Sequence, residues 1–284
     1  MLRIKVMRAE DIPFGVSVTD QENWGVTRRD LQRLMQVSPR GCFIALDGPR
    51  KVGMTTTTSY GRQLAWIGNV IVRPDQRGRS IGRKLVQHAV SYLQKTRVRT
   101  IALYCFDERV RFYGNLGFVK DESFVRLRRD PRKGRRDRTD VPAMPPSSLS
   151  KVLHGDREAF GADRSKLIRM FLDEGTGRIL CSTRNPQGAS YLLIKESETE
   201  CEIGPWVCEH PAPGEPEEMM DHALVEVGSM PVEASCVKRN RKAMHTFESR
   251  DFQVIRSGYR MLYDERAVPG NDSSQYALGF LDKG

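Results

Sequence analysis

A short cationic turn between residues 71 and 85 combines residue types that bind phosphate. The segment reads IVRPDQRGRSIGRKL, so an apolar run ends at Arg73-Pro74 and a helical pattern begins at Ile81. Free backbone amides at a helix N-terminus attract anions, and the helix dipole adds to this attraction. Successive turn amides also form a concave anion nest. The segment is therefore a candidate phosphate-binding site, although a solvated basic turn before an ordinary helix fits the same residues.

Two common nucleotide-binding motifs are absent from this turn. It lacks the GxxxxGK[ST] pattern of nucleotide triphosphatases, and Ser80 interrupts the register of a GxGxxG pattern. The turn therefore argues against a nucleotide triphosphatase.

The turn and a second motif farther along the chain resemble the GCN5-related N-acetyltransferase (GNAT) family. The first motif, VxPxxRGxxIGxxLV, begins at Val72, and the second, FYGNLGF, covers residues 112–118. In this family the turn binds the pyrophosphate of acetyl-CoA and the preceding strand end holds the pantetheine arm. The resemblance implies these cofactor-binding residues: Val70, Ile71, Val72, Arg77, Gly78, Arg79, Ser80, Ile81 and Gly82. Asp75 departs from the family pattern, because it places a carboxylate where Gln or Arg is usual.

The resemblance also implies a catalytic acid, Tyr113. A phenol has a pKa near 10, so it stays protonated at neutral pH and can donate a proton to a departing thiolate. The second half of the chain has Phe247 at the matching position, which cannot donate. An aromatic core residue is the alternative role for Tyr113. The asparagine that the family has seven residues earlier is replaced by Phe106.

Three residues are candidates for binding the amine acceptor: Asp20, Glu22 and Trp24. They lie in the segment where the family forms its acceptor site. Two carboxylates beside an aromatic ring suit an ammonium ion by charge and by cation–π attraction. Helix capping by Asp20 and packing of Trp24 would explain the same residues. No metal-ligand spacing of Cys or His and no Ser-His-Asp arrangement stands out, so we expect no metal.

The elements that position these residues alternate between strands and helices. We expect a strand over 2–7, a helix beginning near Asp11-Ile12-Pro13 and a helix capped by Thr27 that ends before Pro39. Strands follow over 43–46, 52–60, 66–72 and 100–104, and a short helix over 109–116. This order matches the GNAT fold of the α+β class, with a mixed, mainly antiparallel sheet flanked by helices.

The second half repeats the first. Ile67-Gly68 recurs as Ile203-Gly204 and the Phe112 motif recurs around Phe247, at nearly one offset, which favours a duplicated fold. The segment DREAFGADR, residues 156–164, resembles the opening of the second domain in tandem GNAT proteins. Prolines and glutamates in 208–218 replace the cationic turn. This copy is not expected to bind CoA in the same way, and serves as a substrate-side wall or a scaffold.

These patterns divide the chain into three parts. Residues 1–128 form an N-terminal GNAT acetyltransferase domain, 129–150 a basic and Pro/Ser-rich linker, and 151–284 a GNAT-like domain without the pyrophosphate loop. The net charge is +10, and residues 126–138 carry eight Lys/Arg and two Asp. This run is expected to be a solvated connector that makes nonspecific contact with polyanions. It lacks the interleaved aromatic residues that stack on bases.

Composition predicts a soluble, cytoplasmic protein. The chain has 284 residues, enough for one large or two ordinary domains. Its apolar runs are strand-sized, so no bilayer span is expected, and its N-terminus alternates like a strand rather than a signal peptide. Its six cysteines form no CxxC pair, which is typical of free thiols in a reducing compartment. The oligomeric state stays open.

The predicted function is acetyl-CoA-dependent N-acetylation of a primary amine, on a small molecule or a peptide, by direct transfer. A catalytically silent acyl-CoA-binding or scaffold protein is the main alternative, because Asp75, Ser80 and Phe106 depart from the family pattern. A nucleic-acid-binding protein that uses residues 126–138 is a third.

Overall fold

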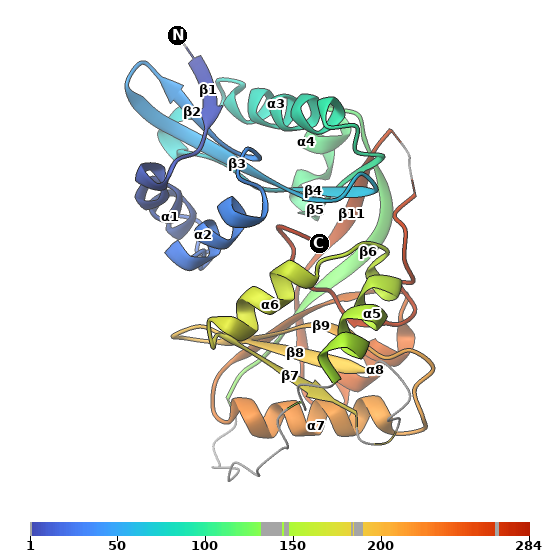
Figure 1. The fold of residues 1–284 in the computed structure, drawn as a ribbon. Coiled ribbons are helices and arrows are strands. Elements are labelled where there is room, and N and C mark those ends of the chain that lie inside the picture. The colour runs from blue at the N-terminus through green and yellow to red at the C-terminus, as the bar shows by residue number, and fades with distance from the viewer. Residues whose placement is uncertain (1, 132–143, 145–147, 183, 185–189, 265–266) are drawn as a thin grey trace.

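The computed structural model describes residues 2–131, 144, 148–182, 184, 190–264 and 267–284. The strands of this described part form a single twelve-stranded sheet that runs through both halves of the chain (Figure 1). Along its main path the order is β1-β2-β3-β4-β5-β11-β6-β10-β9-β8-β7, and β12 pairs with β9. The chain therefore has the predicted α+β architecture with a mixed sheet.

The first half supplies β1 to β6 and α1 to α4. Their bounds are β1 Leu2–Val6, α1 Ile12–Asp20, α2 Arg28–Val37, β2 Cys42–Asp47, β3 Arg50–Tyr60, β4 Leu64–Val72, α3 Ile81–Lys95, β5 Thr100–Phe106, α4 Val110–Gly114 and β6 Phe118–Arg129. The elements predicted for this half are confirmed, with ends that differ by about two residues. Thr27 caps α2 as expected: its hydroxyl accepts from the amide of Asp30, whose carboxylate accepts from the Thr27 amide.

The second half supplies the remaining elements in the same general order. Their bounds are α5 Leu149–Phe160, α6 Ser165–Asp173, β7 Gly177–Cys181, β8 Tyr191–Glu196, β9 Cys201–Val207, α7 Glu215–Val227, β10 Val232–Val237, α8 Arg241–Glu248, β11 Gln253–Tyr263 and β12 Gln275–Ala277. The Ile-Gly pair lies in β4 in one half and in β9 in the other, and the aromatic motif lies at α4 and α8. The predicted duplication is thus confirmed.

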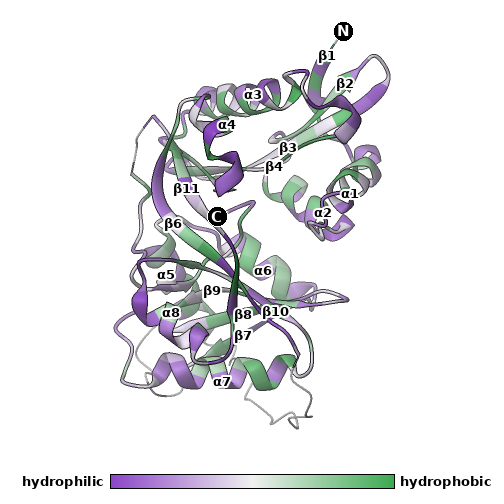
Figure 2. Cartoon of the chain, turned by 180° about the vertical axis from the view of Figure 1, so that it is seen from behind, coloured by the Kyte–Doolittle hydropathy of each residue, from purple (hydrophilic) through white to green (hydrophobic). Residues whose placement is uncertain are grey.

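The two halves exchange a strand at the centre of the sheet. β11 belongs to the second half in sequence, yet it inserts between β5 and β6 of the first half and runs antiparallel to both. β6 in turn pairs with β10 of the second half. Both views of the ribbon show β6 and β11 as the long strands that join the two halves (Figures 1 and 2). Each half is therefore completed by the other.

The helices cover the two faces of the first half's sheet separately. On one face, α3 and α4 pack on alternate residues of β4 and β5, among them Ile67 and Leu103. On the opposite face, α1 and α2 pack against β2 and β3, with Ile44 and Met54 at the centre. The chain segments 160–162 and 278–281 cover the rest of that face, over β4 and β5. The C-terminal end of the described chain lies between the halves (Figure 1).

The start of the basic run is not a solvated connector. Arg126 and Arg128 lie in β6, where their guanidinium groups bind Glu233 of β10. Arg126 also binds Glu202 of β9, with 2.6 Å between Nη1 and the carboxylate oxygen. The alternating pattern of β6 continues through these arginines. Because they pair with glutamates on β9 and β10, they are not free in solvent. Most of the remaining run, residues 132–138, lies outside the described residues.

Candidate active site

The cationic turn presents a row of backbone donors. Within the described chain, no hydrogen-bond acceptor faces the amides of residues 78–83, whereas the Lys84 amide donates to the Ser80 carbonyl at 3.1 Å. Gly78 and Ser80 both have left-handed backbone conformations, with φ of 78° and 58°. Alternation into the left-handed region turns successive amides toward one side. The turn and the start of α3 therefore offer six unpaired donors at the positive end of a helix dipole.

The side chains of the turn are held by weak, exposed contacts. Arg77 donates to the Val72 carbonyl and forms an ion pair with Glu22 at 2.5 Å. Arg79 pairs with Asp47 of the β2–β3 hairpin at 3.0 Å. Exposed ion pairs of this kind contribute little to stability, so an incoming phosphate can displace the acidic partners. The turn brings together all the residues predicted for the pyrophosphate.

The carboxylate of Asp75 is turned to basic partners. It accepts from Arg73 at 3.0 Å, from Gln76 at 3.2 Å and from Arg50 at 2.6 Å. The Arg73, Gln76 and Arg50 contacts lower the pKa of Asp75 to about 2. The negative charge is therefore fixed beside two guanidinium groups. The two arginines thus offset the negative charge of Asp75, the residue that departs from the family pattern.

β4 and β5 separate next to this turn. Their parallel ladder contains only Leu64 to Trp66 and Thr100 to Ala102, although β4 continues to Val72 and β5 to Phe106. A bulge in β4 accompanies the separation: the register with β3 shifts between Gly68 and Ile71, and Asn69 has a φ of 49°. The predicted pantetheine contacts, residues 70–72, thus lie on a strand whose ladder with β5 has ended.

Tyr113 lies on α4 on the face that α3 covers. It is 9% exposed and packs edge-on between Phe112 and Phe118, in the cluster that also contains Leu103 and Cys105 of β5. Burial is the main cause of a pKa raised above the usual 10, and nearby Cys105 adds to it. The hydroxyl is therefore held in its protonated form beside the separating end of β5.

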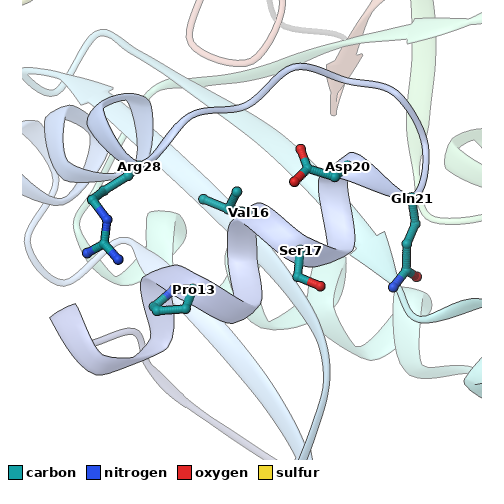
Figure 3. A pocket seen from close by; sticks show the side chains of 6 residues that line it. All are labelled: Pro13, Val16, Ser17, Asp20, Gln21 and Arg28. Atoms are coloured by element: carbon teal, nitrogen blue, oxygen red, sulfur yellow. The ribbon is translucent and has the colours of Figure 1, made fainter.

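The three predicted acceptor residues do not form one cluster in the structure. Asp20 lines a depression of about 420 Å³ between α1 and the start of α2, and Figure 3 shows its carboxylate apart from the Arg28 side chain. Glu22 is engaged by Arg77 of the turn. Trp24 is 42% exposed in the connecting loop. The pair of carboxylates beside an indole that the sequence suggested is thus divided between the turn and the α1–α2 depression.

Two side chains that the sequence analysis did not select, those of Asn69 and Asp282, meet at the β4 bulge. The Asn69 side-chain amide donates to Thr56 Oγ1 at 3.1 Å and to Asp282 Oδ2 at 3.0 Å. The backbone of Asp282 approaches so closely that a Cβ on Gly68 would lie 2.1 Å from its carbonyl oxygen. No local motif marks Asp282. The Gly68-Asn69 pair in a strand was the available signal, because glycine in a strand interior often marks a bulge or a close backbone approach.

The corresponding site of the second half is filled by the protein itself. β9 and β10 share a parallel ladder of three residue pairs, as β4 and β5 do, but β12 pairs with β9 where the strands separate. Leu278 next to it donates its amide to the Ser235 carbonyl at 2.7 Å. At the start of α7, Glu215 is 1% exposed, and its carboxylate accepts from the Ala212 amide at 2.7 Å. An internal strand and an internal carboxylate thus lie where the first half has its separating strands and its cationic turn.

Other kinds of site find little support in the described residues. Over the described ranges there is no cluster of three or more His, Cys, Asp or Glu side chains that could hold a metal ion. The same ranges contain no helix with the length and apolar character needed to cross a membrane. The six cysteines are free thiols; five are buried, and Cys181 is partly exposed.

Comparison with known proteins points to one family for both halves. Residues 7–118 match the model of the acetyltransferase (GNAT) family, and residues 152–277 match that of an acetyltransferase (GNAT) domain. The uncharacterized N-acetyltransferase ycf52 of Porphyra purpurea is 31% identical over 77 residues, which are 27% of this chain and 44% of that protein. The chain thus spans less than half of the length of the first curated relatives it matches.

Solved structures extend the similarity in fold to the whole chain. A proposed acetyltransferase of Pyrococcus horikoshii has a TM-score of 0.82 at 22% identity, over 100% of this chain and 96% of that one. A tandem GNAT protein from the clavulanic acid biosynthesis pathway has a TM-score of 0.64 at 15% identity, over 92% and 98% of the two chains. With family models matching in each half, the chain belongs to the GNAT acetyltransferase family and carries two GNAT domains in tandem.

Proposed function

We propose that the protein is an acetyl-CoA-dependent N-acetyltransferase that acts on a primary amine by direct transfer, and that the first GNAT domain carries the activity. The observation that supports this most strongly is the row of six unpaired amides at residues 78–83, next to a strand that has left its parallel partner. Family membership implies binding of an acyl-CoA. The acetyl group and the primary amine are our assignment.

The donor would bind along β4 and the turn. The amides of residues 78–82 hold the pyrophosphate, with Arg77 and Arg79 exchanging their present carboxylate partners for phosphate oxygens. Residues 70–72 hold the pantetheine arm, so that the thioester lies near the β4 bulge. The residues present fit this ligand for two reasons. The amides of the turn lack internal acceptors, and the negative charge of Asp75 is offset by ion pairs with Arg50 and Arg73.

Transfer requires one bond to form and one to break. The acceptor ammonium first loses a proton, and its nitrogen then attacks the thioester carbonyl carbon to form a C–N bond. The C–S bond breaks, and Tyr113 donates its phenolic proton to the departing thiolate. The nitrogen loses a second proton as the amide forms, and the phenolate regains one from solvent. The balance is one ammonium and one thioester consumed, and one amide, one thiol and one proton produced.

The second domain would not bind the donor in the same way. β12 fills the gap between its separating strands, and Glu215 places a carboxylate at the start of α7. We assign it to supporting and walling the first site. The acceptor, a small-molecule or peptide amine, would enter on the face that bears α1, α2 and Asp20.

The test is release of free thiol from acetyl-CoA with a panel of primary amines, corrected for hydrolysis without amine. Amine-dependent release together with an acetylated amine in the mass spectrum is expected. Binding of acetyl-CoA, seen as a rise in Tm, without transfer to any amine would support the alternative, a silent acyl-CoA-binding or scaffold protein. Absence of both binding and transfer would refute the proposal.

A further inference from the structure

The segment 278–284 of the second domain reaches the β4 bulge of the first. It follows directly from β12, which fills the gap between β9 and β10 in the second domain. Leu281 then packs with the cluster that contains Tyr104 and Phe106 of β5. Asp282 lies against Gly68 and Asn69 of β4, on the face opposite α3 and α4. The chain from β12 onward thus fills the gap between β9 and β10 and then carries a carboxylate to β4 of the first domain.

The segment is anchored through its backbone. Lys195 donates to the Gly279 carbonyl at 2.6 Å, and the Tyr60 hydroxyl donates to the Lys283 carbonyl at 2.7 Å. Arg164, buried in an ion pair with Asp156, donates to the Gly284 carbonyl at 2.8 Å. These anchors come from both domains and use main-chain oxygens. The segment therefore has anchors that do not involve the Asp282 carboxylate.

The Asp282 carboxylate is partly exposed and accepts hydrogen bonds from side chains. Its Oδ2 accepts from the Asn69 side chain, and the side chain keeps 23% of its surface exposed. The ammonium of Lys283 binds both of its oxygens, at 2.6 and 2.8 Å, and lies 5.3 Å from the Phe280 ring. A primary alkylammonium is thus already seated on this carboxylate. An acceptor amine carries the same group.

We propose that Asp282, delivered by the second domain, binds the protonated amine of the acceptor in the active site of the first domain, with Lys283 as its internal competitor. The inference rests on the proposed function, which puts the thioester near the β4 bulge at Asn69. It makes the active site composite: the first domain holds the donor, and the second supplies the charge that selects a cationic amine. The acceptor would displace the Lys283 ammonium from the carboxylate.

The kinetic test uses two changes that each remove one charge and have opposite expected effects. Asp282→Asn should raise the acceptor KM about ten- to a hundredfold, because a charge-assisted hydrogen bond is lost. Lys283→Gln should lower the acceptor KM severalfold, because the competitor is gone. Acetyl-CoA affinity, measured by calorimetry, should change in neither variant. Glu198→Gln removes the same charge from an exposed loop of the second domain and should leave KM unchanged.

The opposite signs separate this role from a structural one. If the Asp282–Lys283 pair merely stabilised the segment, both variants would lower Tm and raise KM together, and that result would overturn the proposal. An unchanged acceptor KM in Asp282→Asn would overturn it as well. Asp282→Glu should recover part of the loss, since the charge returns at a slightly longer reach.

A binding measurement keeps the inference testable if the wild-type protein transfers acetyl to no amine. In that case, n-butylammonium chloride is titrated into the full chain while the ¹⁵N and ¹H signals of the Asn69 side-chain amide are followed. A saturable shift in the wild-type protein that is lost in Asp282→Asn supports the ammonium site even though the proposed activity has failed. No saturable shift in either protein refutes the site.

Discussion

Tyr113 is the side chain on which the proposed chemistry depends most directly. Tyr113→Phe should lower kcat by about a hundredfold or more, the range for loss of a general acid, while acetyl-CoA affinity changes little. The measurement is steady-state kinetics beside calorimetric binding. Tyr259→Phe, on β11, serves as the control and should keep its kcat. Equal losses of kcat and acetyl-CoA affinity in Tyr113→Phe would mean that the ring supports the fold rather than the proton transfer.

The same residue sets an expected pH dependence. Burial raises the pKa of Tyr113 above the usual 10, so the phenol stays protonated up to at least pH 10. The rate should therefore rise with pH as the acceptor ammonium deprotonates, and it should not fall again below pH 10. A descending limb near pH 8 or 9 would assign the acid role to another group.

Single residues also show where sequence reasoning reached its limit. The turn before α3 and the cap at Thr27 could be predicted because each depends on local spacing, whereas the catalytic role of Tyr113 stays a prediction. The ion pair between Asp75 and Arg50 could not be predicted, since the two residues are 25 positions apart in the sequence. Asp282 was missed for the same reason: its contact with Asn69 spans 213 positions. Long-range contacts of this kind leave no periodic trace in the chain.

Strands β6 and β11 likewise depend on long-range pairing that the sequence does not reveal. A period-2 pattern can mark a strand, but it fits pairing within one domain as well as pairing between two. The structure places β11 between β5 and β6, and β6 beside β10. The arginines of β6 bind acidic side chains of β9 and β10. The predicted boundary near residue 128 therefore follows the sequence motifs, whereas the sheet interlocks across it.

Met261 allows the role of β11 to be tested. It is 1% exposed in the second domain's strand, yet it packs in the first domain's cluster with Tyr113, Leu103 and Phe118. Met261→Ala should lower the free energy of unfolding by about 2–5 kcal/mol and should also lower kcat, because the wall behind Tyr113 loosens. Urea unfolding and steady-state kinetics provide the two measurements.

Met230→Ala is the matched control for this change. Met230 is only partly buried and packs against the second domain's own core, so its replacement should cost less stability and leave kcat unaltered. A Met261 variant that loses stability but keeps full turnover would show that β11 supports the first domain without positioning its catalytic side chain.

At the scale of the whole molecule, the tandem arrangement is one interlocked unit. The Asp156–Arg164 pair shows why the DREAFGADR segment matters physically. Arg164 stacks on the Phe160 ring at 4.1 Å, and Phe160 packs against Trp66 and Tyr60 of the first domain. The segment that signals the start of the second domain in the sequence is thus also a contact that joins it to the first.

This interlocking predicts that neither domain folds alone. A fragment of residues 1–131 retains β5 and β6 but loses β11 between them, which exposes unpaired strand edges and the apolar cluster that Met261 completes. A fragment of residues 144–284 leaves β11 and β10 without β6. Each fragment should aggregate or lack cooperative unfolding in circular dichroism. Co-expression should restore a soluble one-to-one complex on a sizing column, with acetyl-CoA again raising its Tm.

If the 1–131 fragment were monomeric, cooperatively folded and stabilised by acetyl-CoA by itself, the strand exchange would be dispensable. The second domain would then serve the first only through the segment that carries Asp282.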